Sequence, residues 1–319
     1  MMTSTFNMAS RLRIGLCIAI PLFFACANSF FFTSGNLFAL MQSFALVGLV
    51  ALGLSLTMIV GEFDLSVAPM VAVGGLILAK MGDSSALVGV LWALAFGLMV
   101  GLINAAFIIK LKVSSLVSTL GAMILLSGFA YWIADGNVVP YYNFDASDVL
   151  DAQFWVLFSP RIVITLVAMA VLLVILNFTR LGRDVYATGS HRQSAIMSGA
   201  NTQAALYFAF GCSGAMAALA GALISISLAT GSPTLGDTLL IQAASAAILG
   251  GVSLGGGIGK VQHVALGVFI LAALSNGLSL LGVSSATTLL VNGCVLGFVV
   301  LANGDLSRLG LRALTRSHG

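Results

Sequence analysis

Long apolar stretches without a charged residue follow one another along almost the whole chain, and only a lipid-embedded fold accommodates them. No residue from Leu37 to Ile59 is charged, and the same holds from Leu65 to Ala79. Most stretches are about 16–24 residues long, close to the ~20 residues that a helix needs to cross the hydrocarbon core. Their apolar content is continuous, whereas membrane barrels are built from strands of alternating polarity. The sequence therefore predicts an all-α, polytopic membrane protein.

Ten candidate spans cover most of the sequence, and the eighth is short and precedes a glycine-rich segment. Short or broken helices are tolerated in membranes where they line a protein-enclosed cavity. Charged residues make up 7% of the chain, against about 25% in soluble proteins. We expect a single transmembrane domain over residues 1–319, with spans at 14–32, 38–60, 65–80, 86–109, 114–134, 160–178, 203–229, 239–250, 261–281 and 286–302.

The distribution of basic residues predicts how this bundle is oriented. If the N-terminus is cytoplasmic, Lys80 and Arg161 are the basic residues left outside, and the other eleven of the thirteen lie inside. The longest exterior segment, Asp135–Ser159, carries four acids and neither Lys nor Arg. The positive-inside rule therefore predicts that both termini are cytoplasmic. The eleven interior residues are Arg11, Arg13, Lys110, Lys112, Arg180, Arg183, Arg192, Lys260, Arg308, Arg312 and Arg316.

Two acids, Glu62 and Asp64, interrupt the apolar sequence beside Gly61. An ionised side chain at the bilayer centre costs roughly 2.5–3.5 kcal/mol, so acids there are functional or tightly partnered. Gly61 provides a place where the helix breaks and exposes backbone groups beside the acids. Alternatively, the segment is a cytoplasmic turn in which water solvates both acids. The local sequence leaves both interpretations open.

Nothing in the sequence indicates catalysis. The cysteines and histidines are widely separated, and no nucleophile motif, P-loop or dinucleotide fingerprint is present. The segment Gly250–Gly259 lacks the Gly-Lys-Ser/Thr ending of a phosphate-binding loop, because Val261 follows Lys260. We expect no enzymatic activity, no metal, no cofactor and no nucleic-acid partner. The scattered residues are Cys17, Cys26, Cys212, Cys294, His191, His263 and His318.

The longest interior loop, residues 179–201, mixes basic and apolar residues. Its sequence predicts a short helix with Ser190 as N-cap and Gly199 as stop. Ala195, Ile196 and Met197 give that helix a small apolar face. Such a helix suits docking into a groove of a soluble partner, and it also suits a position flat on the lipid surface.

This loop resembles the coupling segment of inner-membrane permease subunits of bacterial ABC importers, of the ribose/xylose-type monosaccharide family. The family pattern is Thr-x-x-Gly-Arg, then Tyr-Ala-x-Gly, then Ala-x-x-Ser-Gly, and the chain carries all three parts from Thr179 onward. The resemblance implies that the segment contacts an ATP-hydrolysing subunit. The residues implied in this contact are Arg183, Tyr186, Ala187, Gly189, Ala195, Ser198 and Gly199.

Other stretches between about residues 37 and 302 resemble the same family in the same order. Asp64-Leu65-Ser66-Val67 matches part of its Gly-Ile-Asp-Leu-Ser-Val-Gly signature, with departures at Glu62, Phe63 and Ala68. A glycine-rich segment also matches, and we expect it to form close packing and an interior turn. In the preceding run the second acid of the family is missing and Gln242 replaces an apolar position. The expected structural glycines are Gly250, Gly251, Gly255, Gly256, Gly257 and Gly259.

The resemblance implies an importer of the type II, vitamin B12 importer-like kind in the bacterial inner membrane. Its partners would be an ABC ATPase subunit, a periplasmic sugar-binding protein and a second permease copy, and the solute would cross by alternating access. Asn276 and Asn292 are expected to form interhelical hydrogen bonds. The candidate pathway residues are Gln42, Glu62, Asp64, Ser66, Asn104, Thr119 and Gln242.

Several alternatives stay open at this point. Glu62 and Asp64 would carry a proton or sodium ion in an ion-coupled secondary transporter. Within the ABC class, a nucleoside, an autoinducer or an amino acid is an alternative solute. A structural or receptor membrane subunit is a further alternative, and it would carry no flux of any solute. Arg11 and Arg13, followed by an apolar run ending Ala25-Cys26-Ala27, also fit a cleaved signal peptide.

Overall fold

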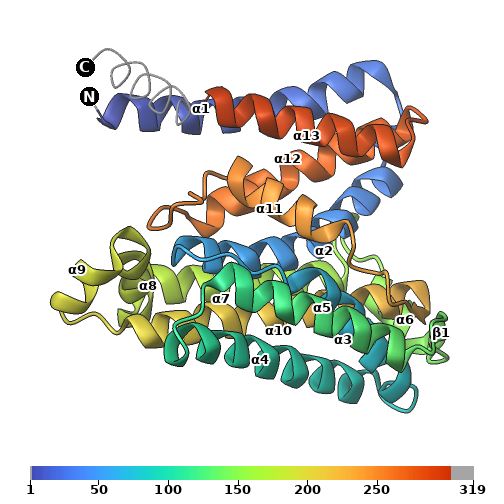
Figure 1. Ribbon diagram of the computed structural model, residues 1–319. Coiled ribbons are helices and arrows are strands. Elements are labelled where there is room, and N and C mark those ends of the chain that lie inside the picture. Colours follow the sequence, from blue (N-terminus) through green and yellow to red (C-terminus); the bar gives the residue numbers. More distant parts are fainter. Residues whose placement is uncertain (1, 303–319) are drawn as a thin grey trace.

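A computed structural model describes residues 2–302 of the chain as a bundle of helices with two very short strands (Figure 1). Arg308, Arg312, Arg316 and His318 lie outside the described residues. The elements are α1 (Met2–Ala27), α2 (Ser34–Ile59), α3 (Val67–Met81), α4 (Ala86–Lys110), α5 (Ser115–Ile133), β1 (Val139–Pro140), α6 (Phe144–Asp151), α7 (Pro160–Phe178), α8 (Arg180–Ser190), α9 (Arg192–Met197), α10 (Thr202–Leu228), β2 (Thr230–Gly231), α11 (Leu239–Leu249), α12 (Val261–Leu280) and α13 (Ser285–Ala302).

Each predicted span range coincides with one helix, and most ends agree within a few residues. The largest difference is at α1, which begins at Met2, whereas hydropathy placed the start of the span at residue 14. Helix α6 and helix α8 were not predicted. Both are more polar than the spans, so a search for apolar stretches passes over them.

Six helices in residues 2–302 are long and apolar enough to cross a membrane: α2, α4, α5, α7, α10 and α12. Four shorter apolar segments, Arg13–Ala27, Val67–Met81, Leu239–Leu249 and Ser285–Phe298, complete the set that hydropathy identified. The all-α, polytopic character of the predicted fold is therefore confirmed.

Helix α10 forms the centre of the bundle and packs against α2, α3 and α4. Small residues bring these backbones together, as membrane helices require. A Cβ atom added to Gly214 of α10 would lie 2.2 Å from the carbonyl oxygen of Gly97 of α4. Every residue of α2 from Gly48 to Ile59 is buried as well, so α2 and α10 together form the core that positions the sites described below.

The two ends of the bundle carry different elements (Figure 1). At one end lie α8 and α9, which connect α7 to α10. At the other end lie α6 and the strands β1 and β2, which pair antiparallel with Val139 opposite Gly231 and Pro140 opposite Thr230. We refer to these as the α8–α9 end and the α6 end.

Candidate functional site

The loop that resembles a coupling segment folds into two helices rather than one. Thr179 caps α8, because its side chain accepts a hydrogen bond from the backbone N–H of Gly182 at 3.2 Å. His191 is extended and caps α9, accepting from the N–H of Ser194 at 3.2 Å through Nδ1. The prediction of Ser190 as N-cap is therefore wrong, since Ser190 is the last residue of α8. Gly199 has a φ of +81° and follows the end of α9, which confirms it as the stop.

The two helices divide the predicted coupling residues between a bundle face and an exposed face. Tyr186, Ala187 and Gly189 are half-buried on α8, and Ala195 is buried on α9. The remaining three, Arg183, Ser198 and Gly199, are exposed. Ile196 and Met197 are also exposed, at 58% and 78%. An apolar pair on an exposed short helix fits the docking interpretation of this segment.

Helix α8 is held against the bundle by backbone contacts between glycines. We call Gly61, Gly189, Gly256 and Gly257 the glycine junction. The N–H of Gly257 donates to the carbonyl oxygen of Ile59 at 2.8 Å, and a Cβ atom on Gly189 would lie 1.8 Å from that same oxygen. Three stretches that are far apart in the sequence therefore meet at one point: the end of α2, the end of α8 and the glycine-rich segment.

A tyrosine hydroxyl adds a side-chain contact beside the junction. Tyr186 donates from its hydroxyl to the carbonyl oxygen of Gly259 at 2.8 Å. Partial burial raises the pKa of Tyr186 above its ordinary value, so the hydroxyl stays a donor at neutral pH. Three of the predicted structural glycines, Gly251, Gly256 and Gly257, have positive φ angles of 84°, 82° and 73°, which a residue with a side chain rarely adopts.

The helix does break at Gly61, whose φ is +83°, and the two acids beyond it have different surroundings. Glu62 is partly exposed and forms an ion pair with Arg192 of α9 at 3.1 Å. It therefore joins the α2–α3 connection to the predicted coupling segment.

Asp64 is fully buried inside a cluster of polar side chains. Its carboxylate accepts from the N–H and hydroxyl of Ser66 at 3.0 and 2.5 Å and from the hydroxyl of Ser213 at 2.8 Å. The side-chain amide of Asn104 donates to the Ser66 hydroxyl at 3.1 Å. Burial raises the pKa of the Asp64 carboxyl, and the hydrogen bonds from Ser66 and Ser213 oppose that shift. The solvated interpretation is therefore wrong for Asp64, which is tightly partnered.

This cluster, which we call the Asp64 cluster, brings together three residues that the sequence predicted as pathway residues: Asp64, Ser66 and Asn104. Ser213 was missed, because one serine in an apolar span carries no distinctive pattern. Thr119 lies nearby on α5, buried, and its hydroxyl donates to the carbonyl oxygen of Ser115 at 2.8 Å. Within residues 2–302, the polar groups of the Asp64 cluster and of Thr119 make their hydrogen bonds to other groups of this chain.

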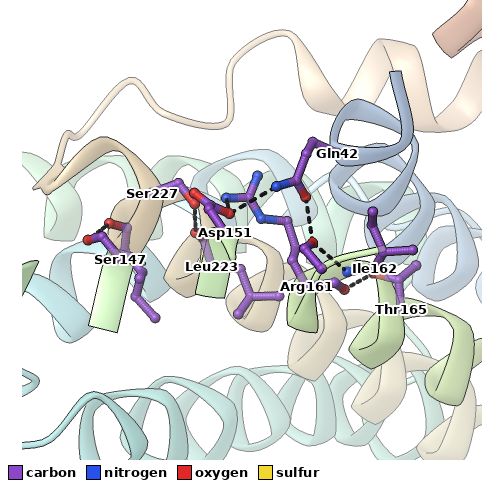
Figure 2. A network of polar contacts seen from close by, with 10 residues as sticks. Gln42, Ser147, Asp151, Arg161, Ile162, Thr165, Leu223 and Ser227 are labelled. Atoms are coloured by element: carbon purple, nitrogen blue, oxygen red, sulfur yellow. Dashed lines mark hydrogen bonds and ion pairs between the residues drawn. The ribbon is translucent and has the colours of Figure 1, made fainter. Parts of the chain in front are cut away.

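A second polar network closes the α6 end (Figure 2). Gln42 of α2 donates to Asp151 of α6 at 3.1 Å and accepts from the hydroxyl of Ser159 at 3.0 Å. Asp151 also forms an ion pair with Arg161, which is the second residue of α7 and 4% exposed. We call Gln42, Asp151, Ser159 and Arg161 the α6 network. Of these residues, the sequence singled out Gln42 as functional and used Asp151 and Arg161 for orientation alone.

Gln242 occupies a third location, in the wall of a cavity of about 260 Å³. Asn292 lies in the same wall and donates to the hydroxyl of Ser275 at 3.1 Å, whereas Asn276 exchanges two hydrogen bonds of 2.9 Å with Asn36. Both asparagines thus make the interhelical bonds predicted for them. The predicted pathway residues therefore fall into three groups: the Asp64 end of α3, the α6 network and this cavity.

The chain belongs to a family of transport permeases. Residues 36–300 match the family model described as the permease component of the branched-chain amino acid transport system. The bundle of apolar helices described above fits a polytopic membrane permease.

Particular relatives are permeases named for sugars. The chain is 31% identical to the ribose import permease protein RbsC of Escherichia coli strain K12 over 310 residues, covering 94% of this chain and 95% of that protein. It is 32% identical to the Bacillus subtilis RbsC over 90% of each chain. It is 33% identical to the L-arabinose transport system permease protein AraH of E. coli K12, over 88% of this chain and 87% of that protein. No solved structure matches the chain significantly.

Proposed function

We propose that this chain is the permease subunit of an ATP-driven importer that moves a monosaccharide across the bacterial inner membrane. Its similarity to permeases named for ribose and arabinose, over nine-tenths of the chain in the case of RbsC, supports the sugar class. The observation that carries the proposal is the α8–α9 segment, which exposes Ile196 and Met197 and is fixed to the bundle through the glycine junction.

In this proposal all ten apolar helices cross the bilayer, in a permease of the type II kind. Both termini and the α8–α9 end are cytoplasmic, and the α6 end faces the periplasm. The ion pair of Arg161 with Asp151 supports this orientation, because it neutralises one of the few basic residues on the exterior side. A periplasmic sugar-binding protein delivers the solute there, and a second permease copy completes the pathway.

The coupling step uses the division of α8 and α9 into two faces. An ABC ATPase subunit contacts the exposed Arg183, Ser198 and Gly199, with Ile196 and Met197 inserted into a groove of that subunit. Its movement reaches α2 directly, because Gly189 contacts the carbonyl oxygen of Ile59 with no intervening side chain. The Asp64 cluster fixes the helix break from which α3 departs. This chain itself hydrolyses no ATP.

The proposal is tested by reconstituting the chain in liposomes with its cognate ATPase subunit and sugar-binding protein. We expect uptake of labelled ribose or arabinose that requires ATP and all components. Replacing Ile196 and Met197 together by Ser should abolish uptake while the chain stays in the membrane. Flux driven by a proton or sodium gradient without ATP would contradict the proposal, and uptake of leucine in place of sugars would assign a different solute.

A further inference from the structure

The 260 Å³ cavity lies between α2, α10, α11, α12 and α13 and has an uncharged wall. Its polar wall residues are Ser43, Gln242, Ser275 and Asn292, and its other wall residues are aliphatic. Ligand pockets for drug-sized molecules measure roughly 300–1,000 Å³, so this cavity has room only for a smaller molecule. The serine, glutamine and asparagine side chains of the wall supply hydroxyl and amide groups, and the remaining wall residues supply aliphatic carbon.

Asn292 has an unsatisfied hydrogen-bonding atom in this wall. The residue is 6% exposed, and its Nδ2 donates to Ser275. Its Oδ1 is buried and accepts no hydrogen bond from the described part of the chain. A buried acceptor without a donor costs about 1–3 kcal/mol. Within the described residues this oxygen is therefore left without a hydrogen-bond donor.

The cavity lies toward the α6 end of the bundle. Ser43 follows Gln42, which donates to Asp151 of α6. Ile224, another wall residue, is two residues before Ile226, whose carbonyl oxygen accepts a hydrogen bond from Ser147 of α6. In the proposed orientation this is the periplasmic half of the protein, where a solute arrives.

The chemistry of the wall selects among solutes. An amino acid brings an ammonium and a carboxylate group, and none of the wall residues carries a charge to pair with either one. Burying unpaired charges is far more costly than burying hydroxyl groups that find partners. A sugar ring, by contrast, has hydroxyl groups for Asn292, Ser275 and Gln242 and C–H groups for the aliphatic part.

We propose that this cavity binds a small, uncharged, polyhydroxylated solute, and that a solute hydroxyl donates a hydrogen bond to Asn292 Oδ1. Gln242, with its amide donor and acceptor, contacts a second hydroxyl. The assignment of the solute as transported cargo rests on the proposed function, whereas the binding itself does not.

A cysteine-protection experiment tests the binding directly. Ser43 is exposed at the cavity wall, and Ser43→Cys in the purified full-length chain is labelled with a small thiol reagent. The chain without this substitution gives the background from Cys17, Cys26, Cys212 and Cys294. We expect ribose or arabinose to slow labelling of Cys at position 43, and leucine to have no effect.

Two further variants separate binding from folding. Asn292→Leu should raise the sugar concentration needed for protection about five- to tenfold, the equivalent of about 1–1.4 kcal/mol for one hydrogen bond. Gln242→Leu should raise it by a similar factor. Asn276→Leu is the matched control, because Asn276 is satisfied by Asn36; it should lower the melting temperature and leave protection unchanged.

Each outcome decides the inference separately from the proposed function. Absence of protection by any sugar, which would mean a water-filled cavity, overturns the inference, as does equal protection by leucine. Protection that is unchanged in both Asn292→Leu and Gln242→Leu overturns it too. ATP-dependent sugar uptake by the complete reconstituted transporter, measured in parallel, reports on the proposed function independently of these results.

Discussion

The two ends of the bundle are held together in opposite ways. At the α8–α9 end the glycine junction joins three segments by backbone contact, and a hydrogen bond from Gly257 to Ile59 closes it. At the α6 end the α6 network joins α2, α6 and α7 through long side chains and an ion pair. A backbone contact without side chains has few alternative arrangements, whereas a side-chain network breaks and re-forms by rotamer changes. From this comparison we expect the first end to transmit motion rigidly and the second to open and close as a gate.

The largest effect is expected at the glycine junction. Gly189→Val adds a Cβ atom 1.8 Å from the carbonyl oxygen of Ile59, so α8 must move away from α2. Overpacking of this kind costs typically 1–3 kcal/mol and here about 3 kcal/mol or more, because the obstacle is backbone. We expect a clearly lower melting temperature in detergent and loss of ATP-coupled uptake.

Gly121→Val is the matched control for this substitution. Gly121 also lies in a helix, but a Cβ atom there would meet nothing within 4 Å. Both substitutions replace glycine by valine within a helix, so their effects on helix propensity are similar and their difference isolates the contact. Equal melting temperatures for Gly189→Val and Gly121→Val would refute the rigid junction.

The next effect is expected in the α6 network. Asp151→Ala leaves the guanidinium of Arg161 buried without its carboxylate partner. Removing one partner of a fully buried pair costs about 3–5 kcal/mol, and the partial exposure of Asp151 reduces this to about 2 kcal/mol. We expect lower stability. If the α6 network acts as a gate, breaking it should also make thiol reagents label the cysteine of Ser43→Cys faster, because the gate is open more often.

The double variant Asp151→Ala with Arg161→Met removes both charges and serves as the control. Its stability should recover toward that of the unmodified chain, while fast labelling of the cysteine persists. Labelling that is as slow in Asp151→Ala as in the parent Ser43→Cys chain would contradict gating at this end.

A smaller effect is expected at Asp64, which lies near the junction but is held by side chains. Asp64→Asn keeps an oxygen for the two donors of Ser66 and places an amide group toward Ser213. It exchanges hydrogen bonds to a charged group for neutral ones, a loss of about 1–2 kcal/mol. We expect reduced uptake with normal amounts of protein in the membrane. Ser213→Ala, which removes one donor alone, should have a weaker effect in the same direction, and normal uptake by Asp64→Asn would exclude a role for the helix break.

The sequence was sufficient to predict the helical membrane fold and nearly all helix ranges, because long uncharged stretches have few other solutions. It was also sufficient to predict the helix break at Gly61 and the stop at Gly199, where glycine chemistry is local. It could not show that Gly189 and Gly257 meet Ile59, because such contacts depend on the packing of segments far apart in the chain. Ser213 and the orphaned oxygen of Asn292 were missed for the same reason: each gains its meaning from neighbours on other helices.

The smallest effect is expected at Glu62, whose ion pair with Arg192 joins the α2–α3 connection to α9. Glu62→Gln removes a partly exposed pair with Arg192, whose side chain is 42% exposed. Such pairs contribute about 0–1 kcal/mol and are screened by salt, so melting temperature should hardly change. Coupling is the sharper measurement: if the pair holds α9 in place, Glu62→Gln should lower the sugar uptake per ATP hydrolysed at low salt. The charge-swapped variant Glu62→Arg with Arg192→Glu should restore that ratio. A ratio that is unaltered in Glu62→Gln at every salt concentration would show that this ion pair takes no part in coupling and would leave that role to the glycine junction of α8.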